Sequence, residues 1–117
     1  MARSMMVSMG GREPVEWTFK TDCCGASLAL CEQAVVVELV RKIIVNARAC
    51  GAQAIACACP LCQVNLDTRQ GDIKKTDPSW IDVPIVYLSQ FVGRAIGVGA
   101  ADLGLKKHMV AAEALLA

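Results

Sequence analysis

Residues 52–62 read AQAIACACPLC, and this stretch decides the fold. Residues 52–58 form a short, almost wholly apolar run, which is typical of a parallel strand that is buried on both faces. Pro60 then stands where proline is favoured, in the first turn of a helix. We therefore expect a buried strand over 52–58 that leads directly into a helix ending at about Gln70.

A short strand and a long helix are expected upstream. Residues 15–19 alternate apolar and polar side chains, as a short strand does. From Leu28 to Ala49, apolar residues recur every three or four positions, which predicts a helix capped by Ser27 and ended by Gly51. The main apolar stripe of this helix consists of Leu28, Cys31, Val35, Leu39, Ile43 and Ala47, and it is widened by Val36, Val40 and Ile44.

A third strand–helix unit is expected downstream. Residues 71–82 are polar and predict a surface loop, and 83–88 form another apolar strand. Ser89 is expected to cap a helix that runs through Ile96, and residues 109–116 a last short helix. This alternation predicts an α/β fold, a small three-layer structure with a parallel sheet of about three strands and flanking helices. In such folds, functional sites gather at the carboxyl ends of the strands.

The chain is short, apolar and nearly neutral. Its 117 residues allow one domain, which we expect over 13–117 after a poorly ordered or truncated segment 1–12. A net charge of +1 gives no electrostatic surface for nucleic acid, and no apolar run has the roughly 18–20 residues of a transmembrane helix. The apolar fraction is 55%, so we expect part of the surface to be covered by another subunit, or by a second copy in a homodimer.

The seven cysteines give the strongest functional signal. An odd number does not favour a disulfide framework, so we expect a reducing, cytoplasmic location. The adjacent pair Cys23 and Cys24 and the C-x-x-C pair Cys59 and Cys62 are predicted to ligate one metal centre. Adjacent thiolates diverge and reach two iron atoms of a cluster more easily than one zinc ion, which favours iron–sulfur. The alternatives are a zinc-stabilised interaction module, a thiol–disulfide exchange protein and four inert, buried thiols.

The wider sequence around these cysteines is similar to a known family. Cys23-Cys24-Gly25, the interval of 34 residues after Cys24, and Cys59-Pro60-Leu61-Cys62-Gln63 together resemble the cysteine-rich CCG domain. Among such domains, the chain is most similar to the C-terminal part of the B-type subunit of heterodisulfide reductase. The similarity includes PIVYLSQ at 84–90 and LGLKKH at 103–108, so it extends over most of the chain.

This resemblance implies a cofactor and partners. Members of the family hold a non-cubane [4Fe–4S] cluster with five cysteines, of which Cys23, Cys24, Cys59 and Cys62 would be four. No cysteine precedes Cys23 here, where the family has its fifth ligand. We therefore expect a fragment or short version of the family's subunit, inactive in isolation and weak in cluster binding. The family implies electron transfer from flavin and iron–sulfur partner subunits and reduction of a small-molecule disulfide.

Other residues have weaker signals. Lys106, Lys107 and His108 are candidates for binding an anionic group of a substrate, although a solvated loop has the same composition. Cys31, Cys50 and Cys57 are expected to be core residues. Three polar residues follow the C-x-x-C pair and would tune a cluster by hydrogen bonding, or would simply be exposed on a helix; they are Gln63, Asn65 and Asp67.

Overall fold

In the computed structural model, residues 24–28 and 30–112 are described. Strands and helices alternate in this part of the chain, in the order α1 (Gln33–Ala49), β1 (Ile55–Cys57), α2 (Pro60–Thr76), β2 (Ile85–Tyr87) and α3 (Leu88–Ala95). The two strands are parallel, with Ile55 opposite Ile85 and Cys57 opposite Tyr87. The predicted α/β class with a parallel sheet is confirmed, while the strand expected over 15–19 lies outside the described residues.

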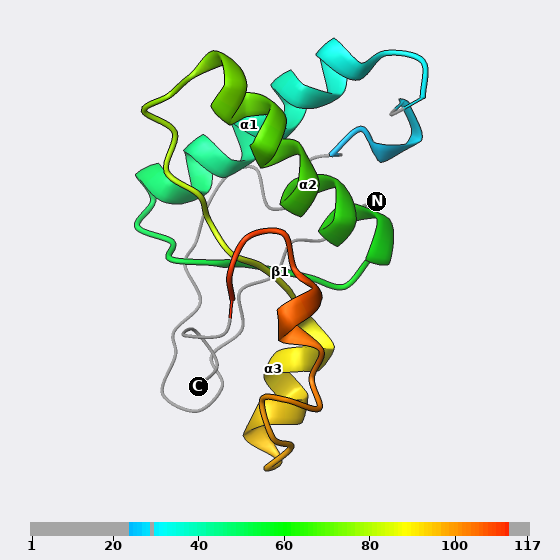
Figure 1. Cartoon of the computed structure of the whole chain (residues 1–117), viewed down its shortest axis with the longest axis vertical. Helices are drawn as coiled ribbons and strands as arrows, with labels where there is room; N and C mark the ends of the chain where they lie inside the picture. The colour runs from blue at the N-terminus through cyan, green and yellow to red at the C-terminus, as the bar shows by residue number, and fades with distance from the viewer. Residues whose placement is uncertain (1–23, 29, 113–117) are drawn as a thin grey trace.

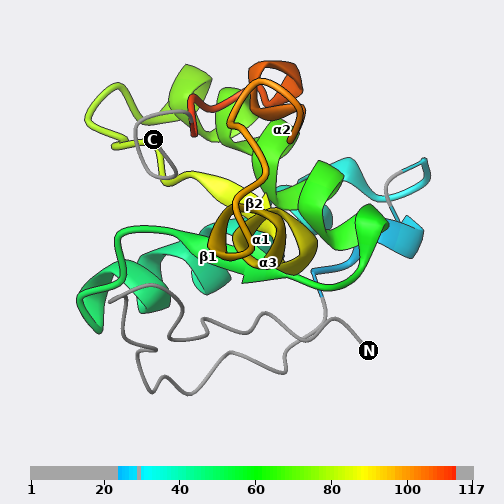
Figure 2. The ribbon, with the colours of Figure 1, turned by 90° about the horizontal axis from the view of Figure 1, so that it is seen from below.

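The sheet separates two apolar clusters, because successive side chains of a strand point to opposite faces. Ile55, Cys57 and Ile85 pack with apolar residues of α1 and α2 on one face. Ala56 and Val86 pack on the other face with α3 and with Leu105, which belongs to a single 3-10 turn, Leu105–Lys107. Figure 1 shows α1 and α2 at one end of the molecule and α3 at the other, with β1 between them. Figure 2 looks along the molecule from the α3 end and shows α3 nearly end-on, in front of the strands.

The apolar stripe of α1 faces the core at a different angle from the one predicted. Val36, Val40 and Ile44, expected only to widen the stripe, are completely buried. Val35, expected at its centre, is exposed. The buried side of α1 packs within this chain, in the core cluster that it shares with α2 and the sheet. The expected homodimer stays a prediction.

The first turn of α1 begins later than predicted. Ala26–Leu28 form a separate 3-10 turn, and Glu32 rather than Ser27 is the residue before the helix. Leu30, between the two, is almost fully exposed, so no buried contact of its side chain stabilises a helix there. The predicted end of α1 is confirmed, because Gly51 follows it with the positive φ of 88° that glycine tolerates.

Helix α2 is longer than the sequence indicates. It continues through the stretch 71–76, where a loop is expected from the sequence, and ends at Thr76. Buried Ile73 holds this last part against the core, whereas the exposed Gly71 does not interrupt the helix. The polar segment is therefore helical because its one apolar side chain is buried.

The segments after β2 differ in detail from the expectations. Tyr87 rather than Ser89 precedes α3, and the side chain of Gln90 accepts a hydrogen bond from the Tyr87 backbone N–H. Residues 109–112, the described part of the helix expected over 109–116, are not helical. Among the described residues, no helix has the length and apolar character needed to cross a membrane.

Candidate functional site

The C-x-x-C pair lies where the chain passes from β1 into α2. Cys59 is the residue immediately before α2, and Pro60 takes the first helical position as predicted. The Cys59 carbonyl accepts a hydrogen bond from the backbone N–H of Gln63 at 3.1 Å. Cys62 lies in the same first turn and is buried, whereas Cys59 is partly exposed. One thiol of the pair therefore faces the interior and the other is accessible.

Cys24 joins this pair from a distant part of the sequence. It is buried and belongs to the same apolar cluster as Cys62. The Cys62 side chain is in hydrogen-bonding contact with the side chains of both Cys24 and Cys59. Three of the four predicted ligands therefore meet at the carboxyl end of β1, and Cys23 lies outside the described residues.

The two thiols of the C-x-x-C pair have opposite shifts in pKa. The backbone N–H of Cys62 lowers the pKa of Cys59 most, and the Cys62 side chain adds to this effect. Burial raises the pKa of Cys62, and the adjacent Cys59 and Cys24 raise it further. Cys59 is therefore the more acidic and more reactive thiol, because the thiolate is the nucleophile.

This difference predicts the order in which iodoacetamide alkylates the metal-free chain. Near neutral pH, Cys59 should react well before Cys62, because a lower pKa gives a larger fraction of thiolate. The alkylation rate of Cys59 should begin to rise at a lower pH in the folded chain than in urea. The alkylation rate of Cys62 should begin to rise at a higher pH in the folded chain than in urea. Mass spectrometry of quenched samples measures both rates. Equal rates for the two thiols in the folded chain would contradict this assignment.

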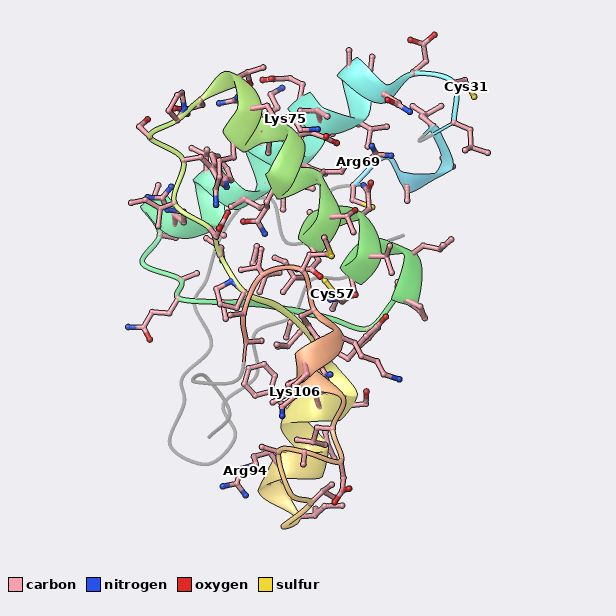
Figure 3. The ribbon with its side chains drawn as sticks, viewed as in Figure 1. Cys31, Cys57, Arg69, Lys75, Arg94 and Lys106 are labelled. Carbon is pink, nitrogen blue, oxygen red and sulfur yellow. The ribbon has the colours of Figure 1, made fainter. Side chains whose placement is uncertain are left out.

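The three remaining cysteines differ in burial, and Cys57 shares an apolar cluster with Cys24 and Cys62. Cys57 is buried in β1, as expected. Cys31 and Cys50 are exposed, so their assignment to the core was wrong. Figure 3 shows Cys31 projecting from the loop before α1, away from the interior where Cys57 lies. Cys31 precedes the helix that was expected to bury it, and Cys50 follows the last turn of that helix.

The thiols that converge within the described residues are in direct contact with one another. Within residues 24–28 and 30–112, no group of three or more His, Cys, Asp or Glu side chains is arranged to hold a metal ion. Cys24 and Cys59 each approach Cys62, and these contacts join protonatable thiols rather than ligands already spaced around an ion. Metal binding here would require the thiols to lose protons, since the thiolate is the ligand.

Helix α2 positions the segments around the thiols through buried polar side chains. Gln63 Nε2 donates to the carbonyl of Ile85 in β2 at 3.0 Å, and Asn65 Nδ2 donates to the carbonyl of Cys24 at 2.9 Å. These side chains satisfy buried backbone groups that would otherwise lack partners. The buried polar residues of α2 are Gln63, Asn65, Asp67 and Gln70.

Asp67 fixes the segment that follows the 3-10 turn at 105–107. Its carboxylate accepts backbone N–H bonds from Met109 at 2.7 Å and from Val110 at 2.9 Å. The two bonds hold His108 close to α2.

The candidate substrate-binding residues lie just before the segment that Asp67 holds. The Nδ1 atom of His108 is 3.2 Å from Gln63 Nε2, and its Nε2 atom is 3.0 Å from Gln90 Nε2. Lys107 lines a cavity of about 460 Å³ together with His108, while Lys106 is exposed and does not line it. Among the described residues, no carboxylate lines this cavity, whose walls are Gln63, Val64, Tyr87, Ser89, Gln90, Leu103, Gly104, Lys107 and His108.

A second cavity lies beside the first and is mainly apolar. Its volume is about 500 Å³, and it shares Tyr87 and Ser89 with the first. Neither Tyr87 nor Gln90 stands out in the sequence, although Gln90 three residues after Tyr87 matches the spacing of a capping box. The walls of the second cavity are Cys57, Ala58, Tyr87, Leu88, Ser89, Val92, Gly93 and Ile96.

Gly25 lets the loop with Cys24 pack closely on α1. Its φ is +78°, and a Cβ added there would lie 2.7 Å from Leu39 Cδ1. We expect Gly25→Ala to lower the free energy of unfolding by about 1–2 kcal/mol, because a left-handed backbone disfavours a side chain. Gly71→Ala is the matched control, since nothing lies within 4 Å of its Cβ and helical alanine should stabilise by up to about 1 kcal/mol. Urea unfolding measures both, and equal effects would contradict the assigned role of Gly25.

Comparison with known proteins gives relatives among reductase subunits. No protein-family model matches the chain. Over 105 residues it is 33% identical to the 8-methylmenaquinol:fumarate reductase membrane anchor subunit of Wolinella succinogenes, covering 90% of this chain and 37% of that protein. It is 26% and 27% identical to the B-type subunits of the CoB-CoM heterodisulfide reductases of Methanosarcina acetivorans and Methanosarcina mazei, over 107 and 110 residues.

The matches cover most of this chain but only part of each relative. Each heterodisulfide reductase match covers 90% of this chain and 36% of the relative. The chain therefore spans a little over a third of the length of the curated relatives that it matches. Along nine tenths of its length, it is related in sequence to part of a reductase subunit, and two of these relatives are B-type subunits of heterodisulfide reductases.

Proposed function

We propose that the chain is an iron–sulfur part of a heterodisulfide reductase-like electron-transfer subunit. The observation that carries this proposal is the meeting of Cys24, Cys59 and Cys62 at the end of β1. The similarity to the B-type subunits of heterodisulfide reductases along 90% of the chain supports it. The motif resemblance to the CCG domain supports it as well.

The donor chemistry of the site fits an iron–sulfur cluster. Thiolates are the usual protein ligands of such clusters, and we assign this role to Cys23, Cys24, Cys59 and Cys62. The lowered pKa of Cys59 makes it the ligand that loses its proton most readily. Burial raises the pKa of Cys62, so this thiol gives up its proton only when a cation offsets the charge. A bound non-cubane [4Fe–4S] cluster would supply one-electron transfer and an iron able to act as a Lewis acid.

The cavity lined by Lys107 and His108 is our candidate for the substrate. Within the described walls, Lys107 is the one lysine and no carboxylate is present, so an anionic group would meet no opposing charge there. The amide nitrogens of Gln63 and Gln90 lie on either side of the His108 ring, and a neutral imidazole accepts a hydrogen bond from one of them. Reduction of a disulfide takes two electrons and two protons and gives two thiols. We propose that flavin and iron–sulfur partner subunits supply the electrons, in a cytoplasmic complex consistent with the odd number of cysteines.

Anaerobic reconstitution with iron and sulfide tests the proposed cofactor. We expect the chain to retain both elements after desalting, because four thiolates of the kind that ligate such clusters are assigned to the site. Retention of zinc in preference to iron would support a zinc-stabilised interaction module instead. Retention of neither metal, with a reversible disulfide between Cys59 and Cys62, would support thiol–disulfide exchange.

A second candidate function has one observation in its favour. The 33% identity to the fumarate reductase anchor of Wolinella succinogenes is higher than the identity to either heterodisulfide reductase relative. The same cysteine site would then pass electrons within a quinol-linked reductase rather than reduce a disulfide. Steady-state assays of a complex purified with this chain separate the two. Oxidation of a quinol without reduction of any small disulfide would favour this second function.

A further inference from the structure

Asn65 links the loop that carries Cys24 to the helix that carries Cys62. It lies on α2 three residues after Cys62 and is 5% exposed. Its Nδ2 donates to the Cys24 carbonyl at 2.9 Å, across 41 residues of sequence. The Cys24 side chain, on the same residue as that carbonyl, contacts the Cys62 side chain. One hydrogen bond therefore connects the backbone of Cys24 to the helix that carries Cys62.

The orientation of the Asn65 amide is fixed by a second contact. Its Oδ1 accepts from Arg69 Nε at 3.4 Å, and Arg69 in turn contacts Asp72 Oδ2 through Nη1 at 3.3 Å. Figure 3 shows Arg69 between α2 and the loop that begins at Cys24. Because Oδ1 is directed to Arg69, the amide nitrogen is directed to the Cys24 carbonyl.

From this geometry we infer that Asn65 is a positioning residue that holds Cys24 against Cys62. The functional importance of this positioning role rests on the proposed cysteine-ligated function, whereas the hydrogen bond itself does not. A buried hydrogen bond of this kind stabilises the folded state, and leaving the carbonyl unpaired adds a desolvation cost. Without the bond, the Cys24 backbone gains more from contact with water, and the loop should separate from α2.

The test compares thiol alkylation in three metal-free variants of the full chain. Asn65→Asp keeps the size and the Arg69 contact but places an oxygen against the Cys24 carbonyl. Asn65→Leu removes both polar contacts. Gln70→Leu is the matched control, because Gln70 is a buried amide on the same helix. Its bonds are made with Leu66, Trp80 and Val83 and not with Cys24. Pulsed iodoacetamide and mass spectrometry give the rate at each cysteine.

We expect both Asn65 variants to raise the alkylation rate of Cys24 roughly 5–30-fold, the factor that corresponds to about 1–2 kcal/mol. Cys57 is buried in the central strand β1, so it reports on opening of the whole fold and should change less than about 2-fold. In Gln70→Leu, any increase should be equal at Cys24 and Cys57. An unchanged rate at Cys24, or an equal rise at Cys57 in the Asn65 variants, would overturn the inference.

A second readout connects this role to metal binding. Co²⁺ reports its thiolate ligands by charge-transfer absorption, and loss of a contact to a ligand residue typically lowers metal affinity about 10–100-fold. We expect Asn65→Asp to weaken Co²⁺ binding by roughly that factor, and Gln70→Leu to have little effect. If the unaltered chain binds neither Co²⁺ nor iron, the proposed function fails, and alkylation of Cys24 still decides the role of Asn65.

Discussion

Cys62→Ser should reduce the iron retained by the reconstituted chain to background. Cys62 is the thiol that contacts both Cys24 and Cys59, so its removal takes away the residue that connects them. The loss in metal affinity should exceed the roughly 10–100-fold that follows from loss of an outer contact. Iron and acid-labile sulfide per chain, measured after anaerobic desalting, give the result.

Cys31→Ser is the matched control for this experiment. Cys31 is exposed and lies outside the group of contacting thiols, so the variant should retain as much iron as the unaltered chain. Circular dichroism of both metal-free variants checks that the fold is intact. Equal iron in the two variants would place the cluster ligands elsewhere in the chain and remove the basis of the proposed function.

Replacement of Asp67 should have the largest effect on stability. Its buried carboxylate accepts two backbone bonds, and hydrogen bonds to a charged group contribute about 1.5–3 kcal/mol each. We expect Asp67→Asn to lower the free energy of unfolding by about 1.5–3 kcal/mol, because one acceptor oxygen becomes an N–H donor. Asp67→Leu should cost about 3–5 kcal/mol, since both N–H groups lose their acceptor.

Asp72→Asn provides the comparison on the same helix. Asp72 pairs with Arg69 and Lys75 at the surface, where an ion pair contributes about 0–1 kcal/mol. Urea unfolding measures both effects, and limited trypsin digestion after Lys106 and Lys107 detects local release of the attached segment. If Asp67→Asn and Asp72→Asn have similar stability and similar digestion rates, Asp67 does not hold that segment.

The sequence predicted the centre of this fold better than its periphery. Residues 52–62 indicate both β1 and the start of α2, because a buried apolar run followed by proline admits few other structures. The buried side of α1 was predicted less well. Val35, Val36 and Val37 are consecutive, so periodicity alone does not decide which of them faces the core. Only packing against α2 and the sheet makes Val36 the buried one.

The candidate site was likewise only partly predictable. Spacing alone singles out Cys24, Cys59 and Cys62, because paired cysteines at a strand end are uncommon without a shared role. The polar residues of α2 have no such signal. Asn65 and Asp67 have the spacing of exposed helix residues, and their burial depends on backbone groups 41 to 43 positions away. No local pattern in a sequence encodes a partner at that distance.

The sequence separations of these hydrogen bonds predict the order in which the parts of the chain fold together. The bonds from Gln70 to Val83 and from Gln63 to Ile85 span 13 and 22 residues. The bonds made by Asn65 and Asp67 span 41 to 43 residues. Closing a longer loop costs more entropy, so β1, α2 and β2 should come together before the segments at either end. When the complete chain refolds from denaturant, Cys59 and Cys62 should therefore take their places at the end of β1 before Cys24 docks beside them. In the proposed function, Cys24, Cys59 and Cys62 would become available together as ligands only after this last docking step.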